Sequence, residues 1–199
     1  MNDEPDTGAG EAPDCCRFPY TRPRLVAGAE RHALHRAAAR AAAYRARDPA
    51  FEHWAAGYGV IRHEPLTQIR VYDMAQQLVA SKRSAEPAQV YRTLAGADRL
   101  ANAAMWLTVH MTYTNRVYLD GRQLQASEFK REPEGHTGGA LNMAIAYAGY
   151  LAANAAAGMT RAWLMGQGHS VAGVDAVNVL VGNTTPAHAA RYVISGRTA

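Results

Sequence analysis

The chain has 199 residues, of which 48% are hydrophobic, and a formal net charge of +4 at pH 7. This length and apolar content suffice for one ordinary domain with a core, and the mild basic excess suits a phosphorylated substrate as easily as a nucleic acid. The longest apolar run, Met143 to Ala153, is too short to cross a bilayer, so no membrane association is expected. The adjacent Cys15 and Cys16 offer neither a disulfide framework nor a zinc site, and a cytoplasmic location follows as the expectation.

The first two thirds of the chain predict a leader and a set of helices. Residues 1–23 combine acids, glycine and proline without periodicity, so we expect a disordered leader. Residues 24–130 predict a mainly helical region. Its helices are expected from Leu25 to Arg47, from Pro65 onward, and from Pro87 to about Thr114.

Residues 131–199 predict an alternation of helix and strand. Ala140 to Ala157 has the composition of a buried helix, Ala162 to Met165 that of a core strand, and Val171 to Val181 that of another apolar helix. A strand between two helices is typical of an α/β fold, in which ligands bind beyond the carboxyl ends of parallel strands. We therefore expect an α/β region that begins near residue 131.

Two histidines in this region are flanked by glycine. His136 lies in the sequence EGHTGG, and His169 closes the sequence MGQGH after the predicted strand. Glycine lets the backbone approach a ligand closely, and amide groups at a helix N-terminus favour anions. We expect the two imidazoles to converge on one cleft at the edge of a small parallel sheet. The accompanying candidates for substrate or cofactor binding are Gly135, Thr137, Gly138, Gly139, Gly166, Gln167 and Gly168.

The segments Glu134–Asn142 and Met165–His169 resemble the N-terminal part of the phosphoketolases. Those enzymes use thiamine diphosphate and Mg²⁺ to cleave xylulose 5-phosphate or fructose 6-phosphate. The similarity is closest to a phosphoketolase-like branch named xylulose 5-phosphate 3-epimerases. It implies an incomplete thiamine-diphosphate-binding, transketolase-like domain over residues 131–199, behind a helical N-terminal appendage. It also implies that His136 and His169 are catalytic and face the thiazolium and the sugar hydroxyls.

The resemblance also implies that part of the enzyme is missing. The family holds Mg²⁺ with a Gly-Asp-Gly turn, whereas the only Asp-Gly here, Asp120-Gly121, has another context. We therefore expect no metal ligands in this chain, poor binding of thiamine diphosphate, and no activity without downstream domains or a second subunit. The chain would be a truncated portion of an aldehyde-lyase of carbohydrate metabolism.

Two alternative functions stay open. One is epimerisation of xylulose 5-phosphate at C3, and the other is a non-catalytic remnant or scaffold.

Two other patterns in the sequence have structural interpretations. His110 falls on the apolar stripe of its predicted helix and is interpreted as a core histidine with satisfied hydrogen bonds. The arginine-rich stretch from Arg17 to Arg47 is interpreted as a solvated face, so no nucleic-acid partner is expected.

Overall fold

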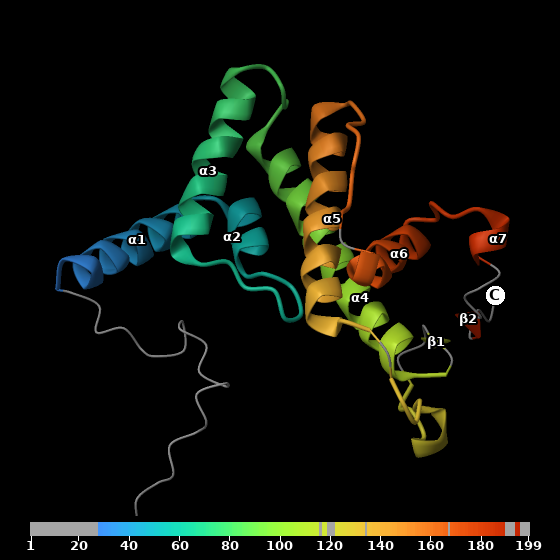
Figure 1. The fold of residues 1–199 in the computed structure, drawn as a ribbon. Coiled ribbons are helices and arrows are strands. Elements are labelled where there is room, and N and C mark those ends of the chain that lie inside the picture. The colour runs from blue at the N-terminus through green and yellow to red at the C-terminus, as the bar shows by residue number, and fades with distance from the viewer. Residues whose placement is uncertain are drawn as a thin grey trace, which may run out of the picture.

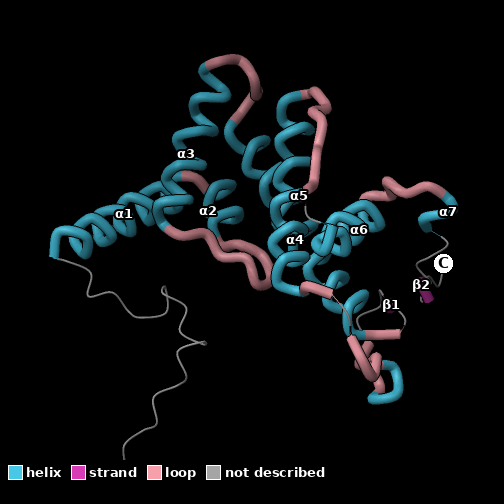
Figure 2. The backbone as a smooth tube through the Cα atoms, viewed as in Figure 1, coloured by secondary structure: helices cyan, strands magenta, loops and turns pink. Residues whose placement is uncertain are grey.

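Helices dominate the protein, as Figures 1 and 2 show. The structure, a computed structural model, describes residues 28–115, 117–118, 122–133, 135–166, 168–189 and 194–195. Of these residues, 70% are helical and 3% lie in strands. The elements in chain order are α1 (Gly28–Arg47), α2 (Pro49–Ala55), α3 (Pro65–Ala80), α4 (Pro87–Tyr113), β1 (Val117–Tyr118), η2 (Ala126–Glu128), α5 (Thr137–Ala157), η3 (Gly168–Ser170), α6 (Val171–Leu180), α7 (Pro186–Ala189) and β2 (Ile194–Ser195).

Proline and aspartate set the starts of several helices. Helices α2, α3, α4 and α7 each begin at a proline, whose fixed φ and missing N–H suit the first helical turn. The predicted helix starts at Pro65 and Pro87 are thereby confirmed. At α2, the Asp48 carboxylate accepts hydrogen bonds from the amides of Ala50 (3.1 Å) and Phe51 (3.0 Å). The expected disordered leader, residues 1–23, lies outside the described residues.

Helices α2, α3, α5 and α6 all pack on helix α4. Its 27 residues extend over about 40 Å at 1.5 Å per residue, and Figure 1 shows it passing behind α5. One buried core lies near its N-terminal half, with α2 and α3, and comprises Phe51, Trp54, Ala55, Ala75, Val90 and Tyr91. A second core lies near its C-terminal half, with α5, α6 and β1, and comprises Ala104, Leu107, Val117, Ala144, Tyr147, Ala176 and Val177. Helix α4 therefore holds both halves of the protein together.

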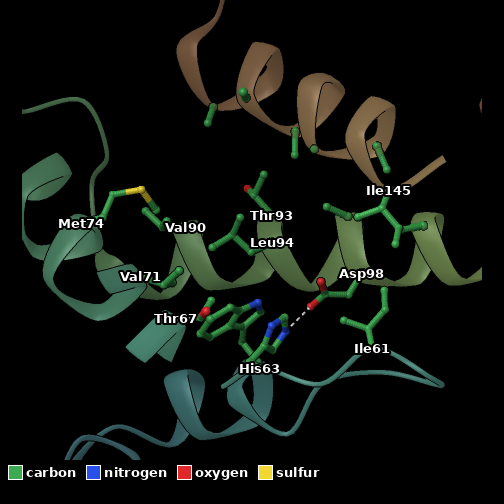
Figure 3. A pocket seen from close by; sticks show the side chains of 18 of the residues that line it. Ile61, His63, Thr67, Val71, Met74, Val90, Thr93, Leu94, Asp98 and Ile145 are labelled. Atoms are coloured by element: carbon green, nitrogen blue, oxygen red, sulfur yellow. Dashed lines mark hydrogen bonds and ion pairs between the residues drawn. The ribbon is translucent and has the colours of Figure 1, made fainter. Parts of the chain in front are cut away.

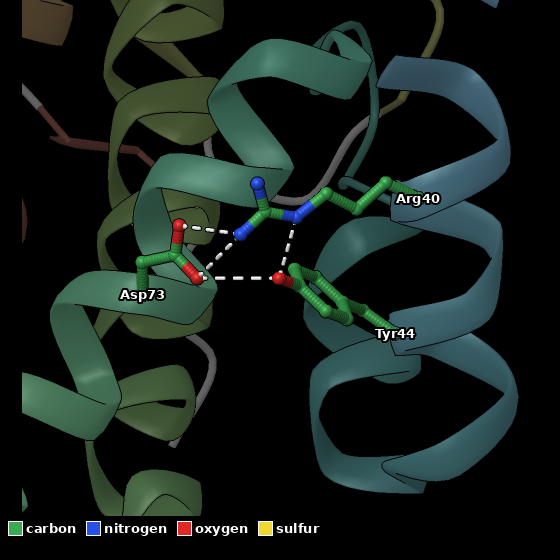
Figure 4. Close-up of polar contacts among 3 residues, drawn as sticks. All are labelled: Arg40, Tyr44 and Asp73. Atoms are coloured by element: carbon green, nitrogen blue, oxygen red, sulfur yellow. Dashed lines mark hydrogen bonds and ion pairs between the residues drawn. The ribbon is translucent and has the colours of Figure 1, made fainter. Parts of the chain in front are cut away.

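A polar cluster connects α1 to α3 at the surface (Figure 4). The Arg40 guanidinium donates to the Asp73 carboxylate at 3.1 Å and to the Tyr44 hydroxyl at 2.6 Å. The Tyr44 hydroxyl donates in turn to Asp73 at 3.3 Å, and its ring stacks on Tyr72 with 4.0 Å between centroids. This arrangement fixes α1 against α3 through one arginine, one carboxylate and a pair of stacked rings.

The expected α/β fold is wrong. Among the described residues, only β1 and β2 are strands, and they form a two-residue parallel pair in which Val117 lies opposite Ile194. The predicted core strand, Ala162 to Met165, has no regular structure, and Leu164 is 96% exposed. A strand is stable only beside another strand, and the described chain places none next to this segment. The segment instead lies against α5, where Trp163 packs on Tyr150 with 4.9 Å between ring centroids.

The transketolase-like domain expected for residues 131–199 is therefore also wrong. Where that domain would place a strand between two helices, helices α5 and α6 pack directly on each other and on α4. The helices that the sequence predicted around the strand do form, as α5 and α6.

Candidate functional site

His136 is the residue immediately before α5. Gly135, which precedes it, has a φ of +122°, a conformation that residues with a Cβ rarely adopt. This glycine therefore permits the turn that places His136 at the helix N-terminus. The His136 side chain is exposed and makes no capping hydrogen bond to α5. Its ring is free to contact a ligand.

His169 lies in η3, directly before α6, and is also exposed. Its ring centroid is 4.7 Å from that of His136, and the two ring planes are inclined by 53°. The predicted convergence of the two imidazoles is thus confirmed. They meet, however, at the N-terminal ends of two packed helices and not at the edge of a sheet.

Two glycines allow the N-terminal ends of α5 and α6 to approach each other. A Cβ on Gly173 would lie only 2.2 Å from the carbonyl oxygen of Ala140, so the backbones of the two helices are in direct contact. A Cβ on Gly139 would lie 3.1 Å from the Ser170 hydroxyl oxygen and 3.6 Å from a ring carbon of His169. The predicted binding residue Gly139 therefore provides the space in which the His169 ring lies.

The N-terminus of α5 presents amide groups beside the two rings. Among the described residues, no group accepts a hydrogen bond from the amides of Thr137, Gly138 or Gly139. Such amides, together with the helix dipole, attract anions. The Thr137 hydroxyl donates to the hydroxyl of Tyr113, 3.0 Å away at the end of α4. The site thus combines two imidazoles with amide donors suited to an anionic, hydroxyl-bearing ligand.

The other predicted binding residues are less constrained by the structure. A Cβ on Gly138, Gly166 or Gly168 would meet nothing within 4 Å, so packing alone does not require glycine at these positions. Gln167 lies outside the described residues. The contribution of these four residues to binding stays a prediction.

The donors at this site match only part of what thiamine diphosphate needs. The diphosphate is held through Mg²⁺, which prefers oxygen ligands such as carboxylates. Within the described part of the chain, no three side chains of His, Cys, Asp or Glu gather where they could hold a metal ion. The imidazole and amide nitrogens of the site suit sugar hydroxyls and anionic oxygens instead. The described residues alone therefore do not fit a magnesium-bound diphosphate.

His110, near the C-terminal end of α4, departs from the satisfied core histidine that the sequence predicted. It is buried, and its ring centroid lies 3.7 Å from the ring centroid of Trp106. Its Nδ1 atom has no hydrogen-bond partner among the described residues. Burial lowers the pKa of His110, because the charged imidazolium loses hydration there. The core position is confirmed, but the expected hydrogen bonding is not.

A cavity of about 660 Å³ between α3, α4 and α5 was not predicted from the sequence (Figure 3). Its lining is mostly apolar, with one polar pair: His63 Nε2 lies 2.9 Å from Asp98 Oδ2. Trp54 stacks on the His63 ring with 4.1 Å between centroids. His63 and Asp98 are 35 positions apart, so no short motif connects them. The only sequence signal was the apolar stripe of the two helices, which does not distinguish a cavity wall from a filled core.

Comparison with known proteins finds no matching family model, no similar curated protein and no similar solved structure. Across the part of the chain that the structure describes, no helix combines the length and apolar character needed to cross a membrane.

Proposed function

We propose that the His136–His169 site binds a ketose phosphate and that the chain is the sugar-phosphate-binding portion of a phosphoketolase-like aldehyde-lyase. One observation carries the proposal: the two exposed imidazoles lie 4.7 Å apart, beside the N-terminus of α5. The amides of Thr137, Gly138 and Gly139, which donate to no described residue, would bind phosphate oxygens, and the imidazoles would bind neighbouring sugar hydroxyls.

The two imidazoles suit proton transfer at hydroxyl groups. Each ring can accept a hydrogen bond at one nitrogen while it donates one at the other. One ring would accept the proton of a sugar hydroxyl while the other donates a hydrogen bond to the adjacent carbonyl oxygen.

Nuclear magnetic resonance of the histidine ring protons tests the proposal. The full chain is titrated with xylulose 5-phosphate, with xylulose and with inorganic phosphate. We expect xylulose 5-phosphate to shift the ring resonances of His136 and His169 saturably, and the other two compounds to bind at least about tenfold more weakly because each offers only half of the recognised groups.

Three variants complete the test. His136→Ala and His169→Ala should each abolish the saturable shifts of the remaining ring of the pair. His53→Ala, a change at an exposed histidine of α2, is the matched control and should leave them intact. Ring resonances that do not respond to xylulose 5-phosphate in the wild-type chain would contradict the proposal and favour the non-catalytic scaffold.

A further inference from the structure

The cavity between α3, α4 and α5 is a groove that is half open to solvent. Helices α3 and α5 both pack on α4 but share almost no contact with each other (Figure 1). Helix α4 therefore forms the floor of the groove, and α3 and α5 form its walls. Two large apolar side chains are exposed on opposite walls, Met74 of α3 by 38% and Ile145 of α5 by 46%. Exposed apolar surfaces with polar rims often mark interaction sites.

The residues that line the groove follow the same helical spacing on all three helices. They recur at i, i+4, i+7 and i+11: Thr67, Val71, Met74 and Leu78 on α3, Val90, Leu94, Ala97 and Ala101 on α4, and Ile145, Gly149, Ala152 and Ala156 on α5. Each stripe extends over about 16 Å, or three helical turns, at 1.5 Å per residue. Helices that pack side by side, and grooves that bind a helix, use mostly apolar stripes with this spacing. The groove thus has the length and form of a site for three turns of a fourth helix.

The wall that α5 contributes lets another backbone approach closely. It is lined by small residues, and a Cβ on Gly149 would meet nothing within 4 Å. The distance between two packed helices is set by the side chains at their contact, so small residues here permit a short one. A small hydrocarbon in this half-open groove would leave one side in water. An amphipathic helix would bury its apolar stripe and keep its polar face in solvent.

Basic residues gather at one end of the groove. Beyond Leu78 and Ala156 the groove continues into a space lined by Arg83 and Arg161. Lys82 lies next to Arg83 in the turn after α3. Among the described residues, no Asp or Glu forms an ion pair with any of these three side chains. This end of the groove therefore attracts a negatively charged group.

The opposite end of the groove carries no such excess of one charge. Arg62 and Asp98 both line it, and the Asp98 carboxylate lies 2.9 Å from His63 Nε2. Since α3 and α5 both end at the basic end, a helix whose N-terminus lies there runs antiparallel to both. Asp and Glu are favourable in the first turn of a helix because of the helix dipole. An acidic first turn thus suits both the bound helix and the basic end.

We infer that this groove binds an amphipathic helix of another protein, about three turns long, whose acidic first turn lies against Lys82, Arg83 and Arg161. Its apolar residues contact α3, α4 and α5 at the spacing that lines the groove. The site is separate from the His136–His169 pair and does not depend on the function proposed for that pair.

Calorimetric titration of the full chain with synthetic peptides tests the inference. The first peptide is alanine-rich and about 16 residues long, with leucine at i, i+4, i+7 and i+11 and glutamate in its first turn. The second has lysine in place of these glutamates. We expect the glutamate peptide to bind saturably and the lysine peptide to bind at least about tenfold more weakly. No saturable binding of the glutamate peptide, or equal binding of both, would overturn the inference.

Charge reversal in the protein separates this contact from differences in peptide helicity. Arg83→Glu combined with Arg161→Glu should reverse the preference, so that the lysine peptide binds more tightly than the glutamate peptide. Both arginines are exposed, so the variant should fold. Arg36→Glu, at an exposed arginine of α1, is the matched control and should keep the original preference. An unchanged preference in the double variant would place the acidic turn elsewhere and overturn the inference.

A substitution in the groove wall locates the apolar face of the peptide. Ile145→Glu should weaken binding of the glutamate peptide at least about tenfold. Leu34→Glu in α1, at a side chain 52% exposed, is the matched control and should leave binding unchanged. Equal binding in the two variants would remove the groove as the site.

Two other occupants of the groove are outcomes of the same test. Analytical ultracentrifugation that shows a wild-type dimer, which Ile145→Glu dissociates, would assign the groove to a second copy of this chain. Octanoate carries a negative charge and a hydrocarbon body without a helix. Octanoate binding as tight as that of the glutamate peptide, and lost in Ile145→Glu, would assign the groove to a small anionic amphiphile. Either result would overturn the inference.

Discussion

The contact between α5 and α6 gives a stability prediction that depends on a single methyl group. In Gly173→Ala the new Cβ would lie 2.2 Å from the Ala140 carbonyl oxygen and 3.0 Å from the Ala144 amide nitrogen. Both atoms belong to the helix backbone, so the two helices must move apart by about 1 Å to restore an ordinary contact. Overpacking of this kind costs about 1–3 kcal/mol, and the better helix propensity of alanine returns about 1 kcal/mol. We expect a net loss of up to about 2 kcal/mol in the free energy of unfolding.

Urea denaturation followed by circular dichroism measures this loss. Gly96→Ala in α4 is the matched control, because its Cβ meets nothing within 4 Å, and it should stabilise the protein by about 0.5–1 kcal/mol. Gly96→Ala should therefore be more stable than the wild type and Gly173→Ala less stable. The free energies of unfolding of the two variants should differ by about 2 kcal/mol. Equal stabilisation by both changes would refute the close packing of α6 on α5. Because η3 leads directly into α6, Gly173→Ala should also disturb the His136–His169 pair.

Two further predictions concern α2 and α4. Asp48→Ala removes the acceptor of two amide hydrogen bonds at the start of α2 and should lower the free energy of unfolding by about 0.5–2 kcal/mol. Asp48→Asn keeps a side-chain acceptor and should retain most of the wild-type stability. Equal losses of stability in the two variants, measured by urea titration, would contradict the capping role of Asp48. Burial lowers the pKa of His110, so the unfolded chain binds this proton more tightly than the folded one. Stability should therefore fall as the pH drops below the ordinary histidine pKa of about 6.5, and His110→Leu should reduce that fall when unfolding is measured at about pH 5 and pH 7.5. An unchanged pH dependence in His110→Leu would show that other groups cause it.

The helices could be predicted from the sequence because their signals are local. Proline at the first helical position and an apolar stripe at helical spacing lie within a few residues of each other in the chain. These signals gave the starts of α3 at Pro65 and α4 at Pro87, and the end of α1 at Arg47. None of these local signals predicts that α4 packs against two cores, because that packing depends on contacts between residues far apart in the sequence.

The strand prediction failed because a strand is not a local structure. The segment from Ala162 to Met165 has the apolar composition of a core strand, but a strand must also find a neighbour for its backbone amides and carbonyls. In the described structure the neighbour of this segment is α5, whose Tyr147 and Tyr150 rings pack on Trp163. Composition alone did not distinguish an apolar segment that packs on a helix from one that pairs in a sheet.

The two histidine sites show which kinds of proximity a sequence reveals. His136 and His169 could be paired in advance because each is marked by flanking glycines and each precedes a predicted helix. The sequence did not predict the physical reason for their contact, which is that Gly173 lets the backbone of α6 approach that of α5 closely. His63 and Asp98 carry no such local mark, and their contact follows only from the way the segment before α3 folds back onto α4. A site that is formed by glycine turns next to helices can therefore be predicted from the sequence. A site that lies between helices far apart in the sequence can be found only from their packing in three dimensions.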